Sequence, residues 1–73
     1  MKKMIIDRIE VTEKIPQQEA EDLVKRLYEL GLRPGLEIHI VGRVSFGSVT
    51  VIQYGQTRMA LNKQEMSCLH GRS

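Results

Sequence analysis

The spacing of apolar residues changes from a helical to a strand repeat at Arg33-Pro34-Gly35, and this change constrains the fold more than any other feature. Before it, apolar residues recur three and four positions apart, as on one face of a helix: Ala20, Leu23, Val24, Leu27 and Tyr28. After it, apolar residues alternate with others from Leu36 to Val41, as in a strand with one buried face. Proline and glycine suit the two central positions of a tight turn. The sequence therefore predicts one amphipathic helix joined by a turn to a sheet.

The ends of this helix carry their own signals. Pro16 stands where proline is best tolerated, at the first helical position. Gly31 follows the last residues of the apolar repeat and predicts a left-handed glycine cap. Asp22 and Arg26 are four positions apart, in the order that favours an ion pair on the helix surface. Together these signals predict a helix that starts at Pro16 and ends before Gly31.

Strand signals lie on both sides of the helix. A first strand with imperfect alternation is predicted from Ile5 to Val11. Gly42 predicts a bend or bulge in the strand that begins at Leu36. Ser45-Phe46-Gly47-Ser48 predicts a loop between that strand and the next one. The first half of the sheet is therefore expected to be short and strongly curled.

The last third of the chain predicts a hairpin and a final strand. Val49–Tyr54 and Thr57–Leu61 flank the two-residue turn Gly55-Gln56. Asn62 followed by Glu65 fits a capping box, which predicts one helical turn over Lys63–Met66. Cys68–His70 is then the last short strand. Short strands linked in this way favour a small barrel, because closure removes exposed sheet edges. The expected fold class is mainly β with one α-helix, a small barrel of about five antiparallel strands.

The length of the chain limits what it can do. Seventy-three residues without a linker or repeat predict a single domain, 1–73. A domain of this size buries only about 60% of the surface of its unfolded chain, so a deep catalytic cleft is not expected. The chain has 11 Lys and Arg, scattered along it, and three aromatic residues, Tyr28, Phe46 and Tyr54. That pattern lacks the basic stripe and interleaved aromatics of a nucleic-acid binder. We therefore expect a protein that binds a protein partner, not an enzyme.

Location in the cell is predicted from the cysteine and the hydropathy. Cys68 is the one cysteine, so no internal disulfide is possible and no oxidising compartment is required. Asp7 interrupts the apolar residues that follow Lys2 and Lys3, well short of a signal peptide. No apolar run approaches the roughly 18 residues of a membrane span. The expectation is a cytoplasmic protein without direct membrane insertion.

A metal site is the strongest chemical alternative. Cys68 and His70 are two positions apart in a predicted strand and could face the same way, with His39 as a third ligand. Thiolate and imidazole suit zinc and late transition metals. Neither Cys-x-x-Cys nor His-x-x-x-His spacing exists, and a structural site requires four ligands. The favoured interpretation is that these three residues bind no metal and that no cofactor is required.

Two exposed positions are candidates for contact with a partner. Phe46 lies in a glycine-containing loop, where a large apolar side chain either covers the core or faces a partner. Arg33, at the turn after the helix, is either a solvated charge or a contact residue. For Phe46 the favoured interpretation is a cover of the core, and for Arg33 it is a solvated charge.

The residues from Arg26 to Ile38 resemble the signature of the FeoA family, the small accessory proteins of bacterial ferrous-iron transport. That signature has Arg-Leu, two residues, Leu-Gly-Leu, any residue, Pro-Gly, two residues and an aliphatic residue, as here. The resemblance continues through Phe46-Gly47, Gly55 and the pair Ala60-Leu61. Two features depart from the family: Ser45 and Ser48 replace a proline and a glycine of its loop, and its opening Leu-x-x-Leu-x-x-Gly segment is missing.

The resemblance implies an SH3-like barrel in the cytosol that docks on FeoB, a membrane ferrous-iron transporter with a cytosolic GTPase domain. The residues it points to as partner-binding are Leu32, Arg33, Pro34, Phe46 and Gly47. Such a protein would lie at the inner membrane only through the transporter, and a homodimer is a further candidate. The alternative is a metal-responsive regulatory domain like the C-terminal module of metal-dependent repressors. Because the opening segment is missing, closure of the barrel at its N-terminal strand is left open.

Overall fold

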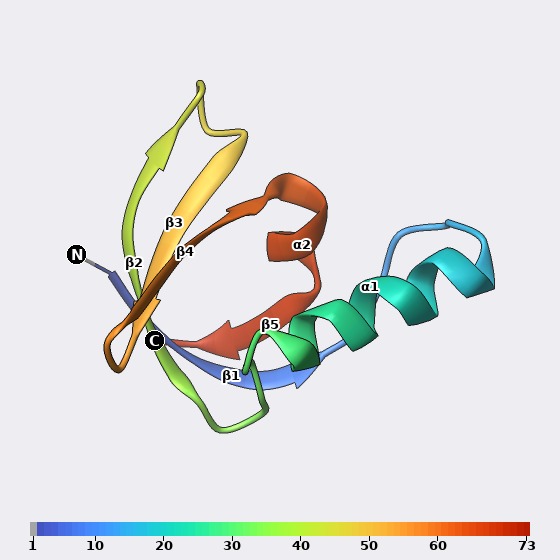
Figure 1. The fold of residues 1–73 in the computed structure, drawn as a ribbon, viewed down its shortest axis with the longest axis horizontal. Coiled ribbons are helices and arrows are strands. Elements are labelled where there is room, and N and C mark those ends of the chain that lie inside the picture. The colour runs from blue at the N-terminus through green and yellow to red at the C-terminus, as the bar shows by residue number, and fades with distance from the viewer. Residues whose placement is uncertain (1) are drawn as a thin grey trace.

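The computed structural model describes residues 2–73 and has five strands and two helices (Figure 1). The elements are β1 (Lys2–Ile9), α1 (Gln17–Glu29), β2 (Glu37–Val44), β3 (Val49–Tyr54), β4 (Thr57–Asn62), α2 (Lys63–Ser67) and β5 (Leu69–Arg72). All strand pairs are antiparallel and form one sheet in the order β4-β3-β2-β1-β5. The prediction of a mainly β, SH3-like fold with about five antiparallel strands is confirmed. No helix of residues 2–73 is long and apolar enough to cross a membrane.

The first strand lies inside the sheet and not at its edge. β1 lies between β2 and β5 and pairs with both, and within residues 2–73 the end strands β4 and β5 do not pair with each other. It runs from Lys2 to Ile9 and not from Ile5 to Val11, because pairing of Lys2 with Ile40 extends the strand through polar residues. At its other partner, a Cβ on Gly71 would lie 2.2 Å from the carbonyl oxygen of Ile5. Only glycine therefore lets β5 approach β1 this closely.

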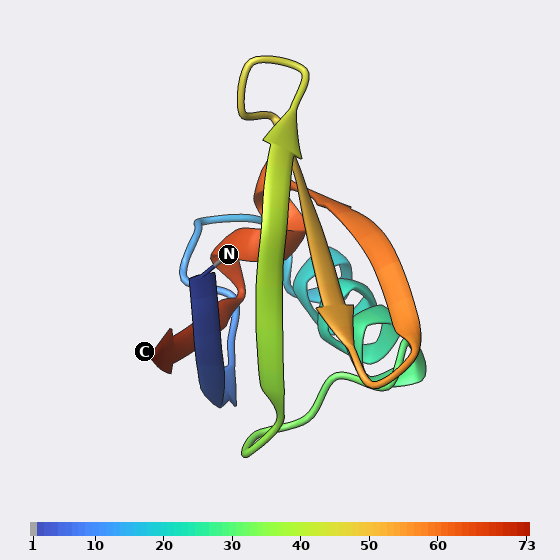
Figure 2. The same cartoon turned by 90° about the vertical axis from the view of Figure 1, so that its left-hand side faces the viewer.

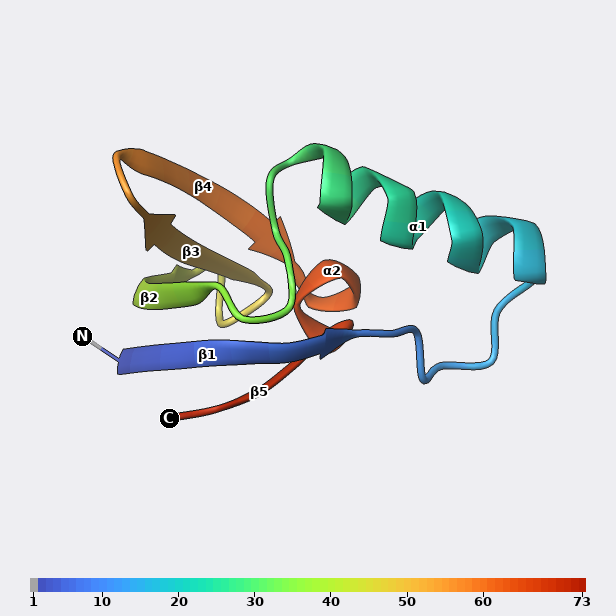
Figure 3. The same cartoon turned by 90° about the horizontal axis from the view of Figure 1, so that it is seen from below.

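The core lies inside the curl of the sheet, which α1 and α2 close (Figure 2). Its members are aliphatic except for one thiol: Ile6, Leu27, Leu32, Ile38, Ile52, Leu61, Cys68 and Leu69. Leu27 is the one fully buried residue of α1. The helix is therefore anchored through its C-terminal half, and its N-terminal half extends beyond the sheet (Figure 3).

The predicted ends of α1 are confirmed at one end and displaced by one residue at the other. Pro16 is the N-cap and precedes the first helical residue, with φ −54° and ψ 141°. Gly31 has φ +95°, the predicted left-handed cap. Tyr54 Oη donates a 2.5 Å hydrogen bond to the carbonyl oxygen of Leu30, which joins this helix end to β3. The end of α1 is thus fixed by both local and tertiary contacts.

A bulge in β2 changes which residues face the core side of the sheet. Ile40 pairs with Ile52, but Gly42 pairs with Val51, so the register shifts between them. Beyond the shift Arg43 lies opposite Thr50, which is buried. Directly opposite residues share a face of the sheet, so the bulge brings Arg43 to the inner face, at the mouth of the barrel.

The short helix α2 begins as the sequence predicts. The side chain of Asn62 accepts a hydrogen bond from the Glu65 backbone at 2.8 Å, and Glu65 Oε1 accepts one from Asn62 N at 2.9 Å. The helix includes Ser67, one residue more than predicted. The last strand starts at Leu69, because Cys68 is the C-cap of α2 and does not belong to the strand. The premise that Cys68 and His70 share a strand is therefore wrong.

Candidate partner-binding site

The β2–β3 loop presents Phe46 to solvent. Ser45, Phe46 and Gly47 all have positive φ, at 54°, 57° and 85°. Gly47 N donates to the carbonyl oxygen of Val44 at 3.1 Å, and Ser48 Oγ to that of Ser45 at 2.7 Å, which closes the loop. The relative exposure of Phe46 is 110%, so its ring covers no core. An aromatic residue held in the left-handed region without packing indicates a role outside the fold.

A hollow with a basic rim lies beside this ring. It has a volume of about 480 Å³ between the β2–β3 loop and α2. Its lining residues are Arg43, Phe46, Gly47, Thr50, Lys63, Met66 and Ser67. Within residues 2–73 neither Arg43 nor Lys63 forms an ion pair, and no acidic side chain lines the hollow. Arg43, Lys63 and Met66 are members of this surface that sequence reasoning missed, because only the bulge and α2 bring them to Phe46.

The turn after α1 positions Arg33 differently. Its Nη1 donates to the carbonyl oxygens of Tyr28 at 2.6 Å and Leu32 at 2.8 Å, and its guanidinium lies 5.0 Å from the centroid of the Tyr28 ring. A cation at a helix C-terminus satisfies free carbonyls and stabilises the helix dipole. Arg33 is exposed, yet these contacts give it a role in closing α1.

The turn itself is fixed to the sheet. Leu36 N donates to the carbonyl oxygen of Arg33 at 3.1 Å, and Gly35 N to that of Ile6 at 2.6 Å. Gly35 has φ +91°, as the third residue of a type II turn requires. Pro34 is exposed, whereas Leu32 is fully buried in the core. Leu32 therefore offers no side chain to a partner.

The predicted contact residues do not form one surface. The turn of Arg33 and Pro34 precedes β2, and the loop of Phe46 and Gly47 follows it. Eight strand residues separate them, a span of about 26 Å. Figure 2 shows the loop and the turn at opposite ends of β2. The candidate contact residues therefore lie on two separate surfaces, and the loop is the one that exposes a large apolar side chain.

The three metal candidates are not gathered into a site. Cys68 is buried, and its Sγ lies 3.4 Å from the carbonyl oxygen of Gln64. His70 Nε2 lies 3.0 Å from the carbonyl oxygen of Glu10, and His39 Nε2 lies 3.5 Å from Glu37 Oε2. No group of three or more His, Cys, Asp or Glu able to hold a metal occurs in residues 2–73. Burial raises the pKa of the Cys68 thiol, which disfavours the thiolate that a metal needs.

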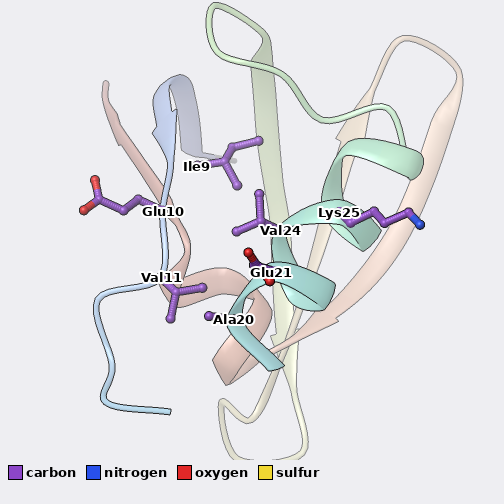
Figure 4. Close-up of a pocket in the computed structure, with 7 residues that line it drawn as sticks. All are labelled: Ile9, Glu10, Val11, Ala20, Glu21, Val24 and Lys25. Carbon is purple, nitrogen blue, oxygen red and sulfur yellow. The ribbon is translucent and has the colours of Figure 1, made fainter. Parts of the chain in front are cut away.

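A second hollow lies between α1 and the end of β1 (Figure 4). Its volume is about 480 Å³, and its lining residues are Ile9, Glu10, Val11, Ala20, Glu21, Val24 and Lys25. Ile9 and Val11 face Val24 and Ala20 across it (Figure 4). Ala20 and Val24 belong to the predicted apolar helix face, and they are half-buried because α1 extends past the sheet. We call this hollow the α1–β1 groove.

The chain matches the model of the FeoA domain over residues 2–72. It belongs to the FeoA family. This FeoA domain also resembles the solution structure of iron(II) transport protein A from Clostridium thermocellum, at 28% sequence identity and a TM-score of 0.73. The match covers 94% of this chain and 38% of the other, so the FeoA domain spans less than half of the length of that chain. Among curated proteins, none matches it.

Proposed function

We propose that this FeoA domain is an accessory protein of ferrous-iron transport that acts at the cytosolic face of the membrane, docking on the cytosolic domain of a FeoB-type transporter. The family supports iron transport as the process, and the solved relative is named as an iron(II) transport protein. The single observation that carries docking is the fully exposed ring of Phe46 in a left-handed, unpacked conformation. Exposed aromatic residues are frequent centres of protein interfaces.

The Phe46 loop is a better docking surface than the turn of Arg33. The guanidinium of Arg33 already donates to the carbonyl oxygens of Tyr28 and Leu32. In contrast, the ring of Phe46 is fully exposed, and Arg43 forms no ion pair within residues 2–73. The hollow beside Phe46 can accept a partner side chain, and its basic rim favours an acidic surface. Pro34 and Gly35 hold the turn in shape, so their proposed contribution to docking is secondary.

Calorimetry of the FeoA domain with the isolated cytosolic domain of the transporter tests the proposal. Phe46→Asn removes the ring and suits the left-handed backbone, so the fold is retained. We expect this variant to bind at least about tenfold more weakly, as for a central interface residue. Val44→Thr is the matched control, because Val44 is also exposed beside the loop but does not line the hollow. Equal affinity of wild type and Phe46→Asn would exclude the loop as the docking site.

A further inference from the structure

We propose that copies of this chain associate head to tail, with the Phe46 loop of one copy seated in the α1–β1 groove of the next. Both halves of the contact lie on the same chain, and they share no residue. The inference concerns the protein alone and does not depend on docking to a transporter.

The groove has the character of a site for one large apolar side chain. Four aliphatic side chains form its walls, two from each side: Ile9 and Val11, Ala20 and Val24. It is open to solvent, and its lining residues come from α1, the end of β1 and the two residues after β1. Apolar surface left in this way is a usual mark of an interaction site. The four aliphatic positions would pack well around an aromatic ring.

The Phe46 loop has the complementary shape. The ring stands free of its own fold, and its backbone hydrogen bonds hold the loop in one conformation. A preorganised loop loses little conformational entropy on binding. Phe46 is the most exposed large apolar side chain of residues 2–73. Its burial in a groove of this kind would therefore remove the most apolar surface from water.

Charge also favours this pairing. Residues 10–29, which include α1, contain six acidic and three basic residues, whereas the rest of the chain contains three acidic and eight basic ones. Glu10, Glu21 and Lys25 surround the groove. Arg43 and Lys63 flank Phe46 and have no acidic partner in residues 2–73. The basic loop of one copy would therefore approach the acidic helix of the next copy, and this charge complementarity favours the head-to-tail orientation.

The head-to-tail orientation sets the kind of assembly. In this orientation the contact is heterologous and forms rings or open chains, whereas a reciprocal exchange of loops between two copies would close as a two-fold dimer. One loop in one groove buries a small area, so the association is weak and concentration-dependent. Each added copy leaves one free loop and one free groove.

Two variants test the two sides of the contact separately. Phe46→Asn removes the loop side chain and leaves the groove, whereas Ala20→Arg fills the groove and leaves the loop. Arginine is a good helix former, so α1 is expected to persist, and circular dichroism checks this. Val24→Gln serves as a second groove variant, and Val44→Thr is the control.

Sedimentation equilibrium from micromolar to millimolar protein provides the readout. We expect the average mass of wild type and Val44→Thr to rise with concentration past the dimer, while each loop or groove variant alone stays monomeric. Mixing Phe46→Asn with Ala20→Arg leaves one functional loop and one functional groove, so the mixture stops at a 1:1 dimer. The rise in mass weakens in high salt, because salt screens the exposed charges.

Several outcomes would overturn the proposal. These are a wild type that stays monomeric at millimolar concentration, a wild type that saturates as a dimer, and variants that associate as wild type does. The proposal would also be overturned if a mixture of Phe46→Asn and Ala20→Arg formed no 1:1 dimer. If wild type is monomeric but Ala20→Arg weakens binding of the transporter domain, the groove belongs to that partner and the head-to-tail contact is excluded.

Discussion

Arg26 Nε lies 3.5 Å from Oε2 of Glu65, and this ion pair links α1 to α2. The side chain of Glu65 is only 6% exposed, while that of Arg26 is 68% exposed. Oε1 of the same carboxylate completes the capping box of α2. One buried carboxylate therefore stabilises the start of the short helix and holds the long helix against it.

Glu65→Ala removes both contacts of this carboxylate. We expect it to lower the free energy of unfolding by about 2 kcal/mol, since a lost cap costs up to about this much. Glu65→Gln keeps the capping acceptor and loses the charge, so its effect is expected to be about half as large. Urea denaturation of the two variants checks the order. If Glu65→Gln and Glu65→Ala lower the free energy of unfolding equally, the ion pair with Arg26 contributes more to stability than the cap does.

Tyr54→Phe removes the hydroxyl that donates to the carbonyl oxygen of Leu30. The ring remains in place, so the expected loss is about 1 kcal/mol, the usual net contribution of one hydrogen bond. For a domain of this size that corresponds to a fall in Tm of about 4–8 °C. Tyr28→Phe is the control, because its ring under Arg33 is retained. Thermal unfolding followed by circular dichroism compares them, and equal Tm values for both variants would contradict the role of Tyr54.

Phe46→Gly is expected to stabilise the domain. The ring contributes no packing, and the backbone φ of 57° at Phe46 is strained for a bulky residue. Relief of that strain is expected to raise the free energy of unfolding by up to about 1 kcal/mol. Phe46→Ala keeps the strain and should leave stability unchanged. A loss of stability in Phe46→Gly, measured in urea, would show that the ring packs on the fold.

Leu32→Ala tests the assignment of Leu32 to the core. Leu32 is fully buried, so we expect a loss of about 2–5 kcal/mol, as for other buried leucines. Pro34→Ala changes an exposed residue and is expected to cost far less, about 0.4–1 kcal/mol. Denaturant melts of both variants distinguish a core leucine from a surface one. If Leu32→Ala were as stable as wild type, Leu32 would not belong to the core and would again be a candidate contact residue.

Stability is expected to fall at alkaline pH. Burial raises the pKa of the Cys68 thiol above its usual 9, and burial also raises the pKa of Tyr54 above its usual 10. Both groups are neutral in the folded protein and lose a proton more readily when unfolded. Their contribution is therefore complete below pH 9 and is lost as pH rises through the folded pKa values.

Urea melts from pH 7 to pH 11 follow this loss. The double variant Cys68→Ala, Tyr54→Phe should start less stable at pH 7 but lose less stability as pH rises. Tyr28→Phe again serves as the control, since it leaves both groups in place. An equal alkaline decline in wild type and the double variant would assign the pH dependence to other groups.

Local patterns were sufficient where one segment contains both partners of an interaction. The capping box of Asn62 and Glu65, the left-handed cap at Gly31 and the hairpin turn at Gly55 involve neighbours in sequence, and all three are confirmed. The lengths and register of the strands could not be predicted from such local patterns. β1 starts at Lys2, earlier than its apolar pattern predicts, because the partner strand decides its length.

Ion pairing shows the same division. The sequence spacing favours Asp22 with Arg26, yet Arg26 approaches Glu65 and Asp22 accepts a 3.0 Å hydrogen bond from Gln18 Nε2. A buried carboxylate attracts a nearby guanidinium more strongly than an exposed one, because less water screens it. No spacing along the helix could predict a partner 39 positions away in α2.

The sequence by itself determined the helix, the turns, the strands and the family, since these depend on periodicity and on residues close together in the chain. Only the tertiary structure decided the binding surfaces. In the folded protein Leu32 is buried in the core, and Arg33 donates to a carbonyl oxygen at the end of α1. Phe46, which follows the other end of β2, is exposed. The bulge at Gly42 turned Arg43 toward that loop. Exposure depends on every element that packs against a residue, and therefore on the whole fold.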